Sequence, residues 1–154
     1  MTVDDRYRTF TTSIAGIAHS IQQIKNLALE PYGLKGRIVN CLFHLYRYDD
    51  GITLLELAKL CREDKAAISR CVSDLRKMGY VTATSESGKN YRAKIRLTAE
   101  GMRAAAHLDR CITEAVESGG AAMTEEERAV FYRCLQNINR DLAGYLEKIS
   151  GKNK

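Results

Sequence analysis

The sequence of residues 52–81 is ITLLELAKLCREDKAAISRCVSDLRKMGYV, and it predicts two short helices joined by a tight turn. Thr53 and Glu56 have the spacing of a capping box, in which each side chain bonds the backbone amide of the other residue. We therefore expect the first helix to span 54–61.

The second helix is expected over 65–78. Asp64 precedes it and can cap its free amides, and Gly79 supplies the left-handed residue that commonly ends a helix. The apolar residues recur at steps of four and three, which predicts one buried face made of Ile68, Val72 and Leu75. Small, polar or basic residues are expected on the outward face: Lys65, Ala66, Ala67, Ser69, Arg70 and Ser73.

Two β-forming segments follow these helices. Residues 80–86 contain tyrosine, valine and threonine, residues 92–98 alternate apolar with basic side chains, and turn-forming residues lie between them at 87–90. This pattern predicts a β-hairpin. Helix, turn, helix and hairpin is the order of a winged helix-turn-helix, so we expect a mainly α fold with a winged lobe over 34–98.

The N-terminal part is predicted to form two helices. The first spans 5–29 and carries apolar residues at heptad-like steps of four and three. Pro31 interrupts it, because proline lacks the amide hydrogen and clashes with the preceding turn. The second helix, at the start of the winged lobe, is expected over 34–47.

The C-terminal part is also predicted to be helical. Thr98 can cap a helix of about twenty residues, which ends near the glycines at 119–120. Thr124 and Glu127 form another capping box, and the helix after them extends to about residue 149 with a second heptad-like seam.

Basic charge is concentrated in the centre of the chain. Residues 62–96 hold nine Lys and Arg against four Asp and Glu, a net charge of +5, whereas 1–61 and 97–154 carry +1 and −1. A local excess of basic residues favours a polyanionic partner, and double-stranded DNA fits the predicted fold. A solvated basic face without a partner is the alternative.

A helix that enters the major groove needs small or polar groups toward the bases and apolar groups on its reverse side. The helix over 65–78 has both. Its alanines permit close approach, Arg70 can pair with guanine or a phosphate, and the basic hairpin suits phosphates or the minor groove. The predicted DNA contacts are Thr53, Lys65, Ala66, Ala67, Ser69, Arg70, Ser73, Lys89, Arg92 and Lys94.

These segments resemble the MarR (multiple antibiotic resistance regulator) family of winged-helix regulators. The matching features are ELA at 56–58, SR at 69–70, LxxxGYV at 75–81 and LTAEG at 97–101. The family's wing carries an Asp-x-Arg signature, which Arg92 matches and Asn90 does not. The resemblance implies a sequence-specific regulator of transcription, a repressor that acts as a homodimer on a pseudo-palindromic operator.

A homodimer is also predicted from the residues themselves. The first and the last helix each carry a stripe of apolar residues at heptad-like steps, called an apolar seam here, and the two seams together expose more apolar surface than one small domain needs to bury. We expect a single domain over 1–154 in which 5–30 and 99–149 are dimerisation helices. Burial of both seams within one chain is the alternative. The predicted dimer contacts are Phe10, Ile14, Ile17, Ile21, Leu135, Ile138, Leu142 and Tyr145.

The resemblance further implies release by a small aromatic or anionic effector, bound between the dimerisation helices and the winged lobe. His19, Arg37 and His44 are the side chains that could meet such an anion. A solvated surface charge is the alternative for Arg37.

Regulators of the same fold that respond to metals or thiol oxidation are alternatives. His107 with Cys111, and Cys41 with His44, have helical spacings that can hold a metal, but no acidic cluster supports them, so no metal or cofactor is predicted. The five cysteines lack CxxC spacing and are expected as reduced thiols. Cys71 lies on the helix over 65–78, where oxidation could disturb DNA contact, but a small structural thiol is the favoured interpretation.

Catalysis is not expected. The sequence has no Gly-rich phosphate loop, GxSxG elbow, HExxH motif or paired carboxylate site. A winged helix that binds only protein is a further class, which the basic hairpin disfavours. Without an apolar run of 18 residues or a secretory signal, we expect a cytoplasmic protein that does not contact membranes.

Overall fold

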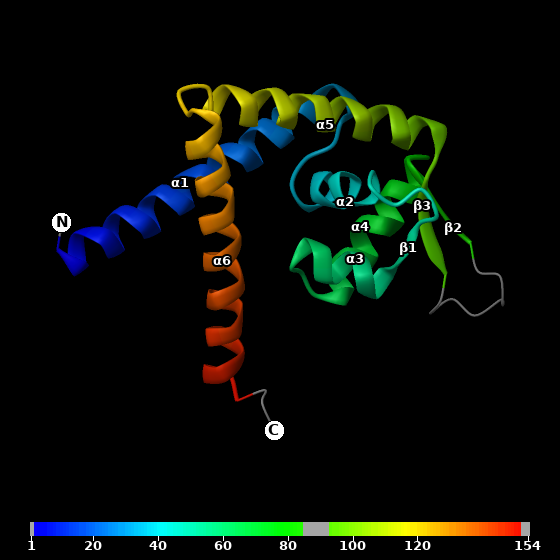
Figure 1. The fold of residues 1–154 in the computed structure, drawn as a ribbon. Coiled ribbons are helices and arrows are strands. Elements are labelled where there is room, and N and C mark those ends of the chain that lie inside the picture. Colours follow the sequence, from blue (N-terminus) through cyan, green and yellow to red (C-terminus); the bar gives the residue numbers. More distant parts are fainter. Residues whose placement is uncertain (1, 85–92, 152–154) are drawn as a thin grey trace. The chain divides into compact units, whose positions relative to one another are not determined.

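The computed structural model describes residues 2–84 and 93–151, and the chain divides into two compact units, Met1–Ala115 and Val116–Lys154. The first unit begins with α1 (Val3–Leu29), the short 3-10 helix η1 (Glu30–Tyr32) and α2 (Arg37–Leu45). It continues with β1 (Ile52–Thr53), α3 (Leu54–Cys61), α4 (Lys65–Lys77), β2 (Val81–Thr84) and β3 (Lys94–Leu97) (Figure 1). Helix α5 (Ala99–Gly119) leads into the second unit, which contains α6 (Glu125–Ile149).

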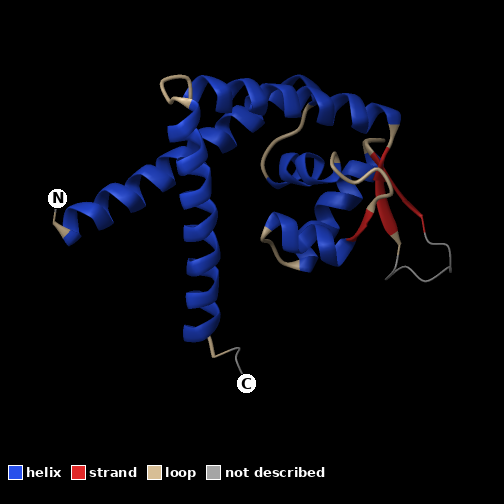
Figure 2. Cartoon of the chain, in the orientation of Figure 1, coloured by secondary structure: helices blue, strands red, loops and turns tan. Residues whose placement is uncertain are grey.

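The predicted fold class is confirmed: the described residues are mainly helical, and a small antiparallel sheet is formed by β1 before the helix-turn-helix and by β2 and β3 after it (Figure 2). Both helices of that motif begin where the sequence predicts, at Leu54 and Lys65. Helix α6 also begins after its predicted capping box, in which the Glu127 amide donates to the Thr124 hydroxyl at 3.2 Å.

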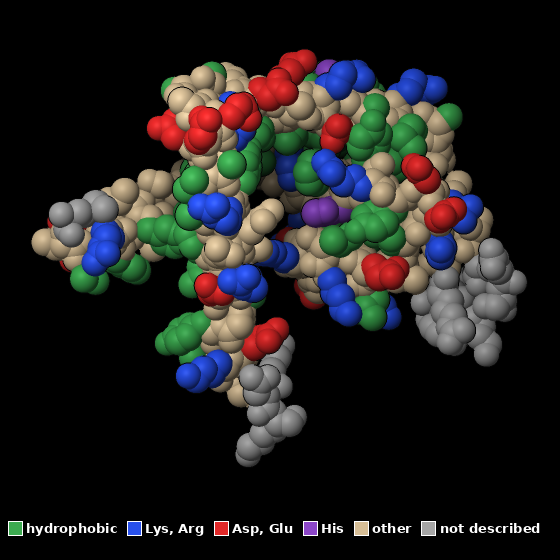
Figure 3. Space-filling model, in the orientation of Figure 1, with side chains coloured by type: hydrophobic (Ala, Val, Ile, Leu, Met, Phe, Trp, Pro, Cys, Tyr) green, Lys and Arg blue, Asp and Glu red, His purple; other side chains and the backbone are tan. Residues whose placement is uncertain are grey.

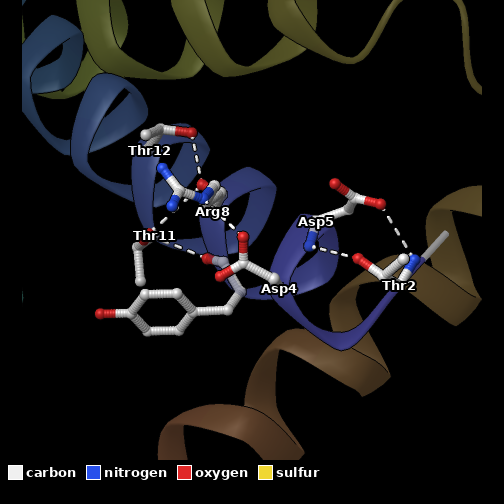
Figure 4. A network of polar contacts seen from close by, with 7 residues as sticks. Thr2, Asp4, Asp5, Arg8, Thr11 and Thr12 are labelled. Atoms are coloured by element: carbon white, nitrogen blue, oxygen red, sulfur yellow. Dashed lines mark hydrogen bonds and ion pairs between the residues drawn. The ribbon is translucent and has the colours of Figure 1, made fainter.

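Helix α1 begins two residues earlier than expected, because Thr2 and Asp5 form a capping box of their own. The Asp5 amide donates to the Thr2 hydroxyl at 3.1 Å, and the Thr2 amide donates to the Asp5 carboxylate at 3.0 Å (Figure 4). Arg8 donates to Asp4 one turn along the same helix at 2.8 Å. Local contacts therefore stabilise the start of the helix.

Helix α2 is shorter than the predicted 34–47. Gly36 has φ +68, a left-handed conformation that a helix interior does not allow, so the helix begins at Arg37. At the preceding turn, Pro31 lies in η1, and Gly33 has φ +69. The expected interruption after α1 is confirmed, and residues 30–36 separate α1 from α2.

The sheet has the order β1-β3-β2, and its first strand was not predicted. Strand β1 has two residues, too few for an alternating pattern to be visible in the sequence. It pairs with the central strand β3 through Ile52 opposite Ile95 and Thr53 opposite Lys94. This pairing attaches the start of α3 to the base of the hairpin.

The core of the first unit lies between α2, α3, α4, the sheet and α5. The predicted inward face of α4 is confirmed, since Ile68 and Leu75 are fully buried and Val72 is nearly so. Leu108 on α5 is also fully buried. Among the described residues, no helix is long and apolar enough to cross a membrane.

Helix α5 approaches the α4–β2 turn unusually closely. The Thr98 amide donates to the Tyr80 carbonyl at 3.0 Å, and the Thr98 hydroxyl donates to the Gly79 carbonyl at 2.7 Å. One turn later, Gly101 is buried with its Cα against the same Tyr80 carbonyl, so close that an added Cβ would overlap the oxygen. The glycine of the LTAEG segment is therefore required by backbone packing.

Candidate nucleic-acid interface

The turn between α3 and α4 is held by backbone geometry at its first end and by a side-chain cap at its second. Arg62 ends α3 in the left-handed region with φ +55, and the Glu63 amide donates back to the Ala58 carbonyl at 3.1 Å. The Asp64 carboxylate then accepts the Ala67 amide at 2.7 Å, which starts α4. That hydrogen bond lowers the pKa of Asp64, and the charges of Arg70 and Arg37 act in the same direction.

An ion pair fixes the same turn to α2. The Arg37 guanidinium at the start of α2 donates to the Glu63 carboxylate at 2.9 Å. This contact joins residues 26 positions apart, so no local sequence pattern indicates it. The turn before α4 is therefore in contact with α2 as well as with α3.

Several of the predicted DNA contacts lie on the exposed side of α4. Lys65, Ala66, Ser69 and Arg70 are exposed, and Ser73 is half-buried. The predicted outward position of Ala67 is wrong: only 3% of this residue is exposed. Residues 67, 71 and 75 lie one above another at four-residue steps, so Ala67 belongs to the buried face.

The base of the hairpin contributes further polar groups. Lys94 is exposed on β3, between Thr53 on one neighbouring strand and Thr84 on the other. Arg96 extends toward the α2–β1 turn and donates to the Asp50 carbonyl at 2.9 Å. The predicted contacts Lys89 and Arg92 lie outside the described residues.

Thr53 has a structural function that limits its freedom. Its hydroxyl accepts the Glu56 amide at 3.3 Å and donates to the Glu56 carboxylate at 2.8 Å. Hydrogen bonds from Thr53 lower the pKa of Glu56, and the nearby charge of Lys94 contributes in the same direction. The base of the hairpin and the start of α3 therefore form one electrostatic cluster.

The three residues predicted to meet an effector have different surroundings. His19 is exposed on α1, and the Arg37 guanidinium is paired with Glu63. His44 is half-buried, and burial followed by the charges of Lys25 and Arg47 lowers its pKa, which favours the neutral imidazole. The described contacts do not bring these three side chains together.

The two His–Cys pairs considered as an alternative metal site do not form one cluster in the described residues. His107 Nε2 and Cys111 Sγ lie 3.7 Å apart on α5, but no group of three or more His, Cys, Asp or Glu suited to a metal is present among the described residues. Cys41 and His44 lie apart from that pair, on α2, where Cys41 is buried.

The arrangement was compared with known proteins. No family model and no curated protein matches the sequence. A solved MarR protein from Peptoclostridium difficile superimposes with a TM-score of 0.80 at 17% identity, covering 92% of both chains. The chain has the fold of the MarR regulators. A MarR regulator from Methanosarcina mazei gives a TM-score of 0.78 at 20% identity, covering 90% of this chain and 99% of the other.

A further structure with the MarR fold contains DNA. It is a MarR-family regulator from Listeria monocytogenes in complex with a 26mer DNA, with a TM-score of 0.77 and 18% identity over 94% of this chain and 95% of that one. The match extends over nearly the whole length of both chains, so the long terminal helices are part of the shared MarR fold along with the winged lobe.

Proposed function

We propose that this chain is a cytoplasmic, sequence-specific DNA-binding regulator of transcription, a repressor rather than an enzyme. The observation that carries the proposal is that α4 has one apolar, buried face and one polar, exposed face. Its reverse face is packed into the core, while Lys65, Ala66, Ser69 and Arg70 are exposed on a helix that two caps and an ion pair hold in place. The DNA-bound Listeria regulator supports this use of the fold.

The chemistry of the exposed residues supports two kinds of DNA contact, one to base edges and one to phosphates. Ala66 leaves room for the helix to approach base edges, and Arg70 can donate two hydrogen bonds to guanine. Lys94, together with Lys89 and Arg92 outside the described residues, supplies charge for phosphates. Thr53 and Ser73 are proposed as lesser contacts, because the Thr53 hydroxyl is bonded to Glu56 and Ser73 is half-buried.

We propose a homodimer built from the terminal helices, on the evidence of exposed apolar seams. Ile17 on α1 is 51% exposed and Leu142 on α6 is 54% exposed in the single chain. Hydrophobic side chains lie at the surface along both helices (Figure 3). The remaining proposed contacts are Phe10, Ile14, Ile21, Leu135, Ile138 and Tyr145. A two-fold dimer presents two copies of α4 about one DNA turn apart, which suits an inverted repeat.

The proposal includes release by a small aromatic or anionic effector. An effector near Arg37 has to compete with Glu63 for the guanidinium. His44 offers a neutral ring beside Phe43, with ring centroids 5.3 Å apart, which suits an aromatic group better than a carboxylate.

Selection of bound duplexes from a random pool tests the proposed function. We expect enrichment of an inverted repeat whose half-sites are centred about 10 bp apart. Enrichment of no sequence, with equal retention of all duplexes, would contradict sequence-specific binding.

Arg70→Ala is expected to weaken binding to the selected duplex by about 1–3 kcal/mol and to relax the base preference at one position in each half-site. Fluorescence anisotropy against the selected and a scrambled duplex measures this. Arg76→Ala, an exposed arginine in the last turn of α4, is the matched control and should leave the preference unchanged. If Arg70→Ala loses the same factor on both duplexes, Arg70 binds phosphate, and base recognition falls to Lys65, Ala66 and Ser69.

A further inference from the structure

Helix α1 is attached to the hydrophobic core of the first unit at one end. All residues of α1 are described, and the two that are buried and belong to the core are Ala28 and Leu29, at its C-terminal end. The rest of the helix, back to Val3, has exposed or half-buried side chains. Apolar packing at one end of a long helix leaves the direction of that helix free to swing, so other contacts have to fix it.

A chain of hydrogen bonds between α1 and α2 supplies such contacts. The Gly36 amide donates to Asn26 Oδ1 at 3.0 Å, and Gln22 Nε2 donates to the same oxygen at 3.3 Å. Asn40 Nδ2 donates to Gln22 Oε1 at 3.1 Å, and Lys25 Nζ donates to Asn40 Oδ1 at 3.3 Å. A backbone amide and a lysine can only donate, so the two ends of the chain fix the orientation of every side-chain amide between them.

The position of this network suits it to hold the helix direction. Its four side chains are half-buried, and Lys25 Nζ also lies 3.9 Å from the centroid of the Phe43 ring on α2. Hydrogen bonds between partly buried groups are costly to leave unmade. Gln22 lies about two turns before Leu29, so the network adds a second point of attachment along the axis of α1.

We propose that Asn26 is a positioning residue, which holds α1 at a fixed angle to the winged lobe and so sets the distance between the two copies of α4 in the proposed dimer. Asn26 binds the amide of Gly36, which directly precedes Arg37. Arg37 is paired with Glu63 in the turn that leads into α4. The network therefore connects a helix of the proposed dimer interface with the segment before α4. Its effect on DNA rests on the proposed function, whereas the fixed angle is a property of the single chain.

A small change of angle has a large effect along a long helix. Positions 12 and 26 are fourteen residues apart. This is about 21 Å of helix, so a swing of about 10° at Asn26 moves Thr12 by about 4 Å relative to the lobe. One base pair of DNA rises by about 3.4 Å. A dimer with a fixed angle therefore fits one half-site spacing, and a dimer with a loose angle fits several.

Pulsed electron paramagnetic resonance tests the angle in the full chain without DNA. Nitroxides are attached in place of Thr12 and Lys59 through p-acetylphenylalanine, which leaves the native cysteines unlabelled. Both positions are exposed, on α1 and α3, and Thr12 lies away from the apolar seam. An excess of unlabelled chain removes distances between protomers. We expect a narrow distance distribution in the unmodified background, and one broader by about 4 Å in Asn26→Leu, which removes the acceptor oxygen.

Three further variants make this measurement specific. Asn26→Asp keeps an oxygen that accepts from the Gly36 amide and from Gln22, so its distribution should remain narrow. Gln23→Leu, at the exposed neighbouring position, is the matched control and should also remain narrow. Asn40→Leu interrupts the same network from α2 and should broaden the distribution, which covers the case that Asn26→Leu does not fold. A narrow distribution in Asn40→Leu and in folded Asn26→Leu, or a broad one in Asn26→Asp, would overturn the proposal.

Operator spacing gives the second readout. Fluorescence anisotropy compares the selected inverted repeat with versions that have one base pair inserted or removed between the half-sites. The unmodified chain should prefer the selected spacing, and Asn26→Leu should lose about two- to tenfold of that preference while it keeps the base preference within each half-site. Equal weakening at all three spacings would overturn the effect on DNA. Failure of the unmodified chain to bind any duplex would instead count against the proposed function, because the distance measurement needs no DNA.

Discussion

Replacing Gly101 by alanine is expected to destabilise the winged-helix unit by about 1–3 kcal/mol or more. The added Cβ would overlap the Tyr80 carbonyl oxygen and lie 3.0 Å from the Tyr80 carbonyl carbon and 3.2 Å from Leu97 Cδ2. Two of these atoms belong to the backbone, and the carbonyl already accepts the Thr98 amide, so a rotamer change cannot relieve the overlap. Urea unfolding followed by circular dichroism measures the loss.

Gly119→Ala is the matched control at the other end of α5. A Cβ on Gly119 meets nothing within 4 Å, and its φ is not in the left-handed region, so this substitution should be neutral or slightly stabilising. Equal unfolding midpoints for the two variants would mean that α5 does not pack against the α4–β2 turn as described. The DNA affinity of the folded fraction should remain that of the unmodified chain.

Ile17→Asp and Leu142→Asp are each expected to convert the proposed dimer into monomers. A two-fold interface contains each substitution twice, and burying an unpaired carboxylate costs several kcal/mol. A loss of roughly 3 kcal/mol already raises the dissociation constant about a hundredfold. Sedimentation velocity at low micromolar concentration distinguishes monomer from dimer. Operator affinity should fall with the dimer, because the two half-sites then bind independently.

Matched controls place the same charge elsewhere on each helix. Gln23→Asp on α1 and Gln136→Asp on α6 are exposed positions away from the apolar seams and should leave the dimer intact. If Ile17→Asp or Leu142→Asp remained dimeric under the same conditions, that helix would lie outside the interface.

Helix boundaries were predictable where a side chain specifies them. Thr53 with Glu56, Asp64, Gly79 and Thr124 mark ends that the structure places within a residue of the prediction. Each of these signals acts between residues that are only a few positions apart, so the local sequence is sufficient to predict where the helix begins or ends. The capping box of Thr2 and Asp5 is of the same kind and could have been found in the same way.

Features that depend on tertiary packing were not predictable. The small side chain of Ala67 suggested close approach to DNA, but the rotation of α4 about its axis turns this residue toward the core. That rotation is set by the elements that pack against α4, which the local sequence does not specify. Strand β1 exists because β3 is there to pair with it. The Arg37–Glu63 ion pair joins distant segments in the same way.

The salt dependence of duplex binding tests the central claim most directly. If α4 and the hairpin bind DNA, their lysines and arginines displace condensed counterions, and log K falls linearly with log salt. For a dimer that makes 6–10 phosphate contacts, we expect a loss of roughly 10³–10⁵ in affinity between about 50 and 200 mM salt. A slope near zero, or no binding to any duplex at low salt, would contradict the account of this chain as a DNA-binding regulator.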